Sequence, residues 1–165
     1  MINSGIVRKI DELGRIVLPK EIRKTLNINT GDDFQISIND KQIILEKFSI
    51  LESFESQLIR IINCFIREDE YKILITIKDK IINYNNDYIS KVISNIIQSR
   101  KIYINNKIDK NIINTNLTIE GKMVILPIVI ESDLLGSIII IGNDNIKNME
   151  TTSKIIFNLI KNILK

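Results

Sequence analysis

The spacing of the apolar residues changes at about residue 49, and this change constrains the fold of the 165-residue chain more than any other feature. Before it, apolar residues occur in short runs or alternate with polar ones, as at Phe34, Ile36 and Ile38, which is the period of a β-strand. After it, they recur every three to four residues, which is the period of a helix. Because domains typically contain roughly 50 to 200 residues, we expect two domains, residues 1–48 and 49–165.

Short apolar stretches between turn-forming residues predict β-strands and one helix in the first domain. The strands are expected at residues 5–10, 15–18, 34–38 and 43–45. Pro19 stands where a helix begins, since its fixed φ suits the first helical turn. The helix is expected to end near Leu26, with Ile22 and Leu26 forming its apolar stripe. The first domain is therefore expected to be mostly β.

A domain of about 48 residues with these elements is too small to bury a sufficient core by itself, because such chains usually require disulfides, metals or a partner chain. The sequence contains one cysteine and no histidine, so an internal disulfide is excluded and the commonest zinc ligand is lacking. We therefore expect the first domain to form an obligate dimer with a second copy of the chain, without a metal or cofactor.

The second domain is predicted to be α+β. A connecting helix is expected from Ser49 to Phe65, and a final amphipathic helix from Met149 to Leu164. Two very apolar strands joined by a turn at residues 131–136 and followed by a helix are typical of an antiparallel sheet covered by helices. These two strands are expected at 122–130 and 137–141. The remaining elements are strands at 73–77 and 80–84, a helix at 88–97 and an asparagine-rich loop at 105–116.

Basic residues concentrate near the N-terminus, although the formal net charge of the whole chain is only +3. Between Arg8 and Lys24, six basic residues stand against three acidic ones. The six are Arg8, Lys9, Arg15, Lys20, Arg23 and Lys24. Without further information, such a run is more often a solvated surface than a binding site.

Several classes of protein lose support from what the sequence lacks. The absence of histidine removes the usual general base, so an enzyme is not expected. Cys64 falls in an apolar helical pattern, where we expect a small buried side chain. The N-terminus lacks the apolar stretch of a signal peptide, and no apolar run approaches the roughly 18 residues that span a bilayer. We therefore expect a cytoplasmic protein without a membrane partner.

Residues 5–26, GIVRKIDELGRIVLPKEIRKTL, resemble the AbrB family of bacterial transition-state regulators, and the resemblance continues through Gly31-Asp32 and residues 43–48. It implies a swapped-hairpin β-barrel formed by two chains, which agrees with the size argument. It also implies that double-stranded DNA is the partner of this domain. The positions that match the family's DNA-binding residues are Arg8, Arg15, Arg23 and Lys24, with Lys9 as a further candidate. Asp11, Glu12 and Gly14 are expected to form the turn.

The chemistry of these side chains suits DNA. A guanidinium group binds phosphate bidentately or reads a guanine edge, whereas lysine mostly neutralises phosphate. Lys24 stands where the family has the second residue of an arginine pair, so it keeps the charge but loses the planar fork. Roughly six to eight phosphate contacts by a dimer imply a log–log salt slope of about −5 to −7. The resemblance therefore implies strongly salt-dependent binding.

The layout of the whole chain is similar to that of sporulation regulators with a GAF-type second domain. Residues 127–129 and 135–139 carry this similarity. It implies a GAF-like sensor or oligomerisation domain, and a tetramer joined through the helices of that domain. A small-molecule effector and a purely assembling role both remain open, because no convergent polar cluster is visible in the sequence. No ligand-binding residue is predicted.

Two functions remain to be compared. The favoured one is a DNA-binding regulator of sporulation or transition-state genes. The alternative is the antitoxin of a toxin–antitoxin pair, since related swapped-hairpin barrels serve as antitoxins whose extended acidic tails neutralise a toxin. The segment after residue 48 does not have the pattern of such a tail, which favours the regulator.

Overall fold

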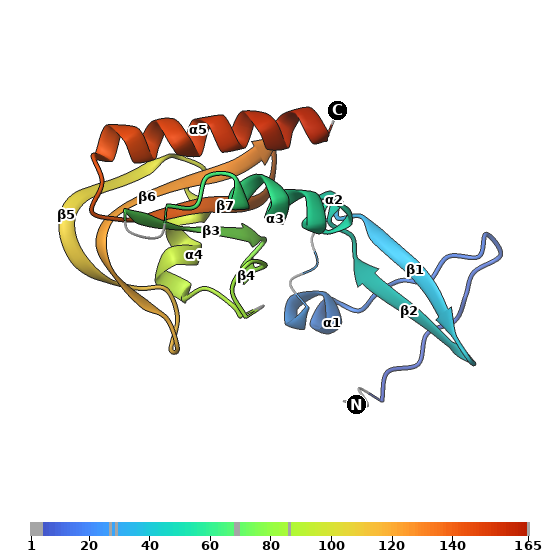
Figure 1. Cartoon of the computed structure of the whole chain (residues 1–165). Helices are drawn as coiled ribbons and strands as arrows, with labels where there is room; N and C mark the ends of the chain where they lie inside the picture. The colour runs from blue at the N-terminus through green and yellow to red at the C-terminus, as the bar shows by residue number, and fades with distance from the viewer. Residues whose placement is uncertain (1–4, 27, 29, 68–69, 86, 165) are drawn as a thin grey trace. The chain divides into compact units, whose positions relative to one another are not determined.

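The computed structural model describes residues 5–26, 28, 30–67, 70–85 and 87–164. The chain consists of two compact units, Met1–Phe48 and Ser49–Lys165, which we call the N-terminal and C-terminal units. Figure 1 shows the elements of both.

The N-terminal unit contains one short helix and one β-hairpin. The helix α1 spans Lys20–Thr25 and is preceded by Pro19, as predicted. Strand β1 (Phe34–Asn39) pairs antiparallel with β2 (Gln42–Lys47). Asp40 in the connecting turn has a φ of 50°, which is a conformation that aspartate tolerates in turns. The predicted helix and second hairpin are confirmed.

The predicted strands at residues 5–10 and 15–18 are wrong for the single chain, where neither segment is a strand. The segment follows an irregular path that reverses at a turn (Figure 1). Hydrogen bonds from Asp11 N to Arg15 O and from Gly14 N to Asp11 O, each 3.0 Å, hold this turn. A strand needs a ladder of backbone hydrogen bonds along its edge, and a single copy supplies no such ladder here.

The hairpin β1–β2 exposes its apolar side chains. Ile36 lies opposite Leu45 and Ile38 opposite Ile43, so all four share one face, which we call the apolar hairpin face. Ile38 is 80% exposed and Ile43 is 70% exposed. Among the described apolar residues of the N-terminal unit, Pro19 alone is buried, and no aliphatic or aromatic side chain is. This unit has no core in a single chain.

The C-terminal unit is an antiparallel five-stranded sheet with helices, which confirms the α+β prediction. Its strand order is β4-β3-β7-β6-β5. The strands are β3 (Tyr71–Ile77), β4 (Lys80–Ile81), β5 (Tyr103–Ile112), β6 (Thr118–Ile130) and β7 (Asp133–Gly142). The helices are α2 (Ile50–Ser53), α3 (Glu55–Asn63), α4 (Lys91–Gln98) and α5 (Ile146–Ile163).

Each face of this sheet has its own core, because side chains alternate between faces along a strand. On β7, Ile138 and Ile140 belong to the core beneath α3 and α5. Ile139 and Ile141 belong to the core beneath α4. Figure 1 shows α5 and α4 on opposite sides of the sheet. Burial on both faces explains why these strands are continuous apolar runs rather than alternating ones.

The prediction of an asparagine-rich loop at 105–116 is wrong, because most of this segment belongs to the strand β5. β5 is an edge strand that pairs only with β6, and nearly all of its side chains are exposed. Polar residues can therefore occupy consecutive positions. The alternating pattern that identifies a half-buried strand is consequently missing from the sequence.

Two further predictions in the C-terminal unit need correction. The connecting helix is not continuous, because it breaks at Phe54 into α2 and α3. Cys64, expected to be buried, is exposed at the end of α3, where its thiol donates a hydrogen bond to Arg60 O (3.3 Å). A helical apolar pattern does not distinguish the covered stripe from its margins.

The turn predicted over 131–136 is shorter than expected. Glu131 and Ser132 alone join β6 to β7, with φ values of 49° and 77°. Gly136 lies inside β7 instead, where a Cβ atom would come within 1.9 Å of Thr76 O. The glycine therefore permits close approach of β3 to β7.

Candidate nucleic-acid interface

Asp11 organises the turn between the two arms of residues 5–18. Its Oδ1 accepts hydrogen bonds from the backbone N–H groups of Leu13 (3.0 Å) and Arg15 (2.8 Å). Its Oδ2 accepts a hydrogen bond from Arg15 Nε (2.8 Å). These bonds lower the pKa of Asp11, and the backbone N–H of Arg15 is the largest cause. Gly14 adopts a φ of 75° in the same turn, which glycine accommodates without strain.

Arg15 is oriented by this turn yet remains accessible. Its contact with Asp11 uses Nε and leaves the two terminal amino groups of the guanidinium for a ligand. The Arg15 side chain is 70% exposed. An exposed pair of this kind contributes little to stability, so its main effect is to hold the guanidinium in one geometry. Bidentate recognition of phosphate requires such an ordered fork.

Arg23 and Lys24 lie in the last turn of α1, where their charges interact favourably with the helix dipole. Both are exposed, and neither has a carboxylate partner among the described residues. Ile22 is partly buried, whereas Leu26 is 61% exposed. The predicted apolar stripe of α1 is therefore only half covered in a single chain.

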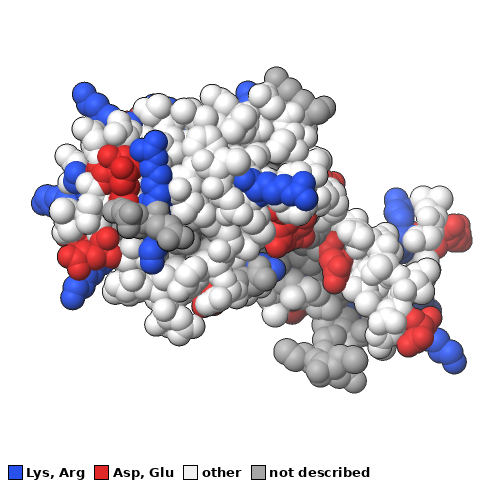
Figure 2. Space-filling view, viewed as in Figure 1, with Lys and Arg blue, Asp and Glu red and all other residues white. Residues whose placement is uncertain are grey.

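Arg8 and Lys9 lie on the arm that precedes the turn, and both are exposed. Arg8 Nη1 donates a hydrogen bond to Val7 O (3.1 Å). In Figure 1 the turn and α1 lie at separate places in the N-terminal unit. On the face shown in Figure 2, basic and acidic side chains are interspersed. The single chain thus exposes all five candidate residues.

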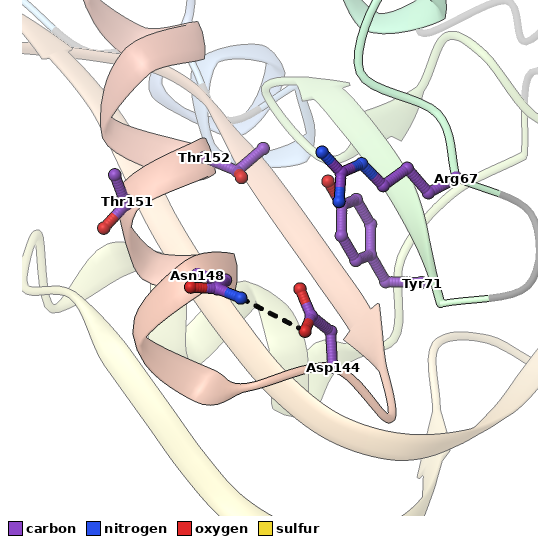
Figure 3. Close-up of a pocket in the computed structure, with 6 residues that line it drawn as sticks. All are labelled: Arg67, Tyr71, Asp144, Asn148, Thr151 and Thr152. Atoms are coloured by element: carbon purple, nitrogen blue, oxygen red, sulfur yellow. Dashed lines mark hydrogen bonds between the residues drawn. The ribbon is translucent and has the colours of Figure 1, made fainter.

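The C-terminal unit contains a polar pocket that the sequence did not reveal. It has a volume of ≈ 320 Å³, and its lining comes from two segments far apart in the chain. The lining residues are Arg67, Tyr71, Asp144, Asn148, Thr151 and Thr152 (Figure 3). Only the pairing of β3 with β7 brings these segments together, so no local motif could have indicated them.

Other kinds of site find little support in the structure. Among the described residues, no group of three or more His, Cys, Asp and Glu could hold a metal ion. In the same part of the chain, no helix is long and apolar enough to cross a membrane.

Both units match known families. Residues 51–165 match the family described as stage V sporulation protein T C-terminal, transcription factor. Residues 7–47 match the family described as antidote-toxin recognition MazE, bacterial antitoxin.

Individual relatives from Bacillus subtilis agree with these matches. Stage V sporulation protein T is 30% identical over 159 residues, which cover 86% of this chain and 85% of that protein. The transition state regulatory protein AbrB is 52% identical over 48 residues, which cover 29% of this chain and 50% of that protein. A solved structure of the N-terminal DNA recognition domain of AbrB is 51% identical and covers 30% of this chain and 92% of that one, with a TM-score of 0.26.

The two units and their matches define a transcription factor with an AbrB-type N-terminal unit. The matched family is described as a transcription factor and one relative as a transition state regulatory protein, and neither description names an enzyme. The chain belongs to the stage V sporulation protein T family.

Proposed function

We propose that this protein regulates transcription of sporulation or transition-state genes by binding double-stranded DNA through its N-terminal unit, in the cytoplasm. The exposed basic side chains of residues 8–24 carry this proposal. They lie in the unit that is 52% identical to a transition state regulator. The chain's membership of a family described as transcription factors supports the same function.

The five candidate residues take two roles. Arg8, Arg15 and Arg23 make bidentate contacts with phosphates or guanine edges, because their forks present paired donors. Lys9 and Lys24 neutralise phosphates as point charges and add affinity without sequence preference.

A second copy of the chain completes the N-terminal unit. The apolar hairpin face is open in the single chain, and residues 6–18 do not form a strand there. A swapped-hairpin dimer satisfies both requirements at once, because the partner covers the apolar face and supplies the ladder. It also doubles the number of basic residues that meet DNA. Contacts between C-terminal helices then join two dimers into a tetramer.

The C-terminal unit acts as a GAF-like sensor that changes DNA affinity when it binds a small molecule. Its antiparallel sheet with helices on both faces is compatible with a GAF-like fold. The polar pocket in this unit gives an effector a place to bind.

The test is DNA binding by the full-length protein across a salt series. Fragments of the host genome are titrated with the wild type, with Arg15→Ala/Arg23→Ala, and with Lys41→Ala as a control outside the basic segment. The double variant removes four guanidinium groups per dimer, so we expect affinity to fall at least about a hundredfold. The wild type and Lys41→Ala should keep a steep salt slope. Unchanged binding by a folded double variant would contradict the proposal.

An antitoxin is the second candidate, and the match of residues 7–47 to an antitoxin family favours it. The chain beyond residue 48 argues against it, because that part is a folded sheet with two cores rather than an extended acidic tail. Co-purification of a small toxin from the native host, together with no DNA binding at low salt, would support this alternative.

A further inference from the structure

The polar pocket of the C-terminal unit lies where the start of β3 meets the start of α5. Arg67 and Tyr71 contribute from the β3 side, and Asp144 lies in the loop before α5. Asn148 and Thr152 project from the first turns of α5 (Figure 3). Its volume of ≈ 320 Å³ is at the lower end of the roughly 300–1,000 Å³ of small-molecule pockets. It therefore fits a small metabolite better than a nucleotide.

The pocket holds one positive and one negative side chain. Arg67 forms an ion pair with Glu70 through Nη1 (3.0 Å), and its side chain is 64% exposed. The pKa of Arg67 is raised, mainly by the hydrogen bond with Glu70 and also by the charge of Asp144. No ion pair joins Arg67 directly to Asp144 among the described residues. Arg67 therefore keeps Nη2 and Nε for a ligand beside its bond to Glu70, and Asp144 is not neutralised by Arg67.

One carboxylate oxygen of Asp144 accepts hydrogen bonds from the described part of the protein, and the other does not. Its Oδ1 accepts hydrogen bonds from Asn145 N (2.6 Å) and from Asn148 Nδ2 (3.3 Å). These bonds fix the carboxylate at the N-terminus of α5 and leave Oδ2 without a partner among the described residues. An oxygen held in this way is a ready acceptor for an ammonium group.

Neutral polar groups complete the pocket. The ring of Tyr71 is buried, with only 5% of the residue exposed, while its hydroxyl points toward the guanidinium of Arg67 and Thr152 (Figure 3). The hydroxyl of Thr152 has no hydrogen-bond partner among the described residues. Thr151 differs, because its hydroxyl bonds to Lys147 O (2.8 Å) within the helix. Thr152 and Tyr71 can thus bond to a polar ligand at no cost to the fold.

A ligand with only one charge would meet one attractive and one repulsive group in this pocket. A ligand that carries both a carboxylate and an ammonium meets two attractive ones. We propose that this pocket binds a small zwitterion of the amino-acid class, with the carboxylate at Arg67 and the ammonium at Asp144. The binding itself stands on the pocket alone, whereas its effect on DNA affinity rests on the proposed function.

The test uses the full-length protein and ligand-observed NMR followed by calorimetry. The probes are the L-amino acids with uncharged side chains, together with propionate and propylamine as single-charge analogues. We expect at least one amino acid to bind with a Kd of about 1 mM or lower, and both analogues to bind at least tenfold more weakly. No binding by any amino acid of the set would overturn the proposal. Equal binding of propionate would do the same by showing a simple anion site.

Variants locate the binding. Asp144→Asn keeps the accepting Oδ1 and removes the charge, so we expect affinity to fall about ten- to a hundredfold, as for the loss of a charged hydrogen bond. Arg67→Gln should act similarly, and Thr152→Val should weaken binding severalfold without altering either charge. Lys101→Gln, an exposed residue in the same unit, serves as the control and should leave affinity unchanged.

Circular dichroism and thermal unfolding check that each variant is folded. If Asp144→Asn or Arg67→Gln does not fold, the affinity of Thr152→Val still tests where the ligand binds. Unchanged affinity in the folded variants would place the ligand elsewhere and overturn the proposal. DNA titrations with and without the amino acid separate the two hypotheses. Amino-acid binding by a protein that fails to bind DNA would support the pocket and contradict the proposed function.

Discussion

The two units of this chain differ in how much of their apolar surface they bury. Among the described residues, every buried aliphatic or aromatic side chain lies in the C-terminal unit, from Leu51 to Ile160. The N-terminal unit leaves Val7 84% exposed and Ile38 80% exposed. The C-terminal unit therefore has the core of an independently folding domain, whereas the N-terminal unit does not.

The difference shows that apolar content alone does not make a core. Full burial of an isoleucine or leucine contributes about 1.5–3 kcal/mol, and these values are upper estimates because the unfolded chain is already partly compact. The four side chains of the apolar hairpin face contribute little of this in a single chain. A second copy that covers these four side chains would supply the missing free energy of burial. We therefore infer that folding and dimerisation of the N-terminal unit are one event.

The largest expected effect comes from a charge on the apolar hairpin face. In an isolated chain, Ile38→Glu would be nearly neutral, since the side chain is exposed. In the proposed dimer it would bury an unpaired carboxylate, which is strongly destabilising. We expect DNA binding to become undetectable in a filter-binding or anisotropy assay.

The matched control for this prediction is Gln42→Glu, because Gln42 lies on β2 of the same hairpin outside the apolar face. It should bind DNA nearly as the wild type does. Wild-type affinity of Ile38→Glu would show that nothing covers the hairpin, and the two units would no longer differ in the way argued above.

A cavity in the C-terminal unit should have the next largest effect. Ile156 on α5 is fully buried, with 0% exposure, so Ile156→Ala should reduce the free energy of unfolding by about 2–5 kcal/mol. Chemical denaturation followed by circular dichroism measures this change. Asn158→Ala, an exposed position on the same helix, should change it by less than about 0.5 kcal/mol. A small effect of Ile156→Ala would contradict the assignment of this core.

The smallest expected effect concerns Asp11. Its folded-state pKa is depressed below the ordinary value of 3.8, first by the backbone N–H of Arg15. The bonds of this carboxylate therefore stabilise the turn fully above that value, and their contribution is lost as pH falls through the folded-state pKa. An NMR titration of the carboxyl carbon should give a midpoint below 3.8.

Arg15→Ala provides the companion measurement for this titration. It removes the side-chain bond but keeps the backbone bond, so the midpoint should move only part of the way back. A midpoint at the ordinary value in the wild type would show that the turn is not formed in solution.

Much of the fold follows from local patterns. The hairpin β1–β2 and the helix after Pro19 were predictable, because alternating isoleucines and a proline at a helix start act locally. β5 was not predictable, because an exposed edge strand needs no apolar alternation. The strands expected at 5–10 and 15–18 depend on backbone partners that one chain does not supply. The sequence pattern therefore predicts strands there, whereas the single chain has none.

The two candidate sites also differ in whether the sequence could indicate them. The basic residues of the N-terminal unit form a contiguous motif, so Arg8, Arg15 and Arg23 could be named from the sequence. The pocket unites Arg67 with Asp144 across 77 positions of the chain, and only the antiparallel pairing of β3 with β7 brings them together. Sites built by tertiary contacts leave no short signature in the sequence.

Amide hydrogen exchange of the full-length wild type tests the central claim most directly, because it compares both units in one sample. We predict that the amides of β1 and β2 are strongly protected and that their protection increases with protein concentration, while protection of β6 and β7 does not depend on it. Exchange in β1 and β2 at the rate of an unfolded chain, with the C-terminal sheet still protected, would contradict the claim that a second copy completes the N-terminal unit.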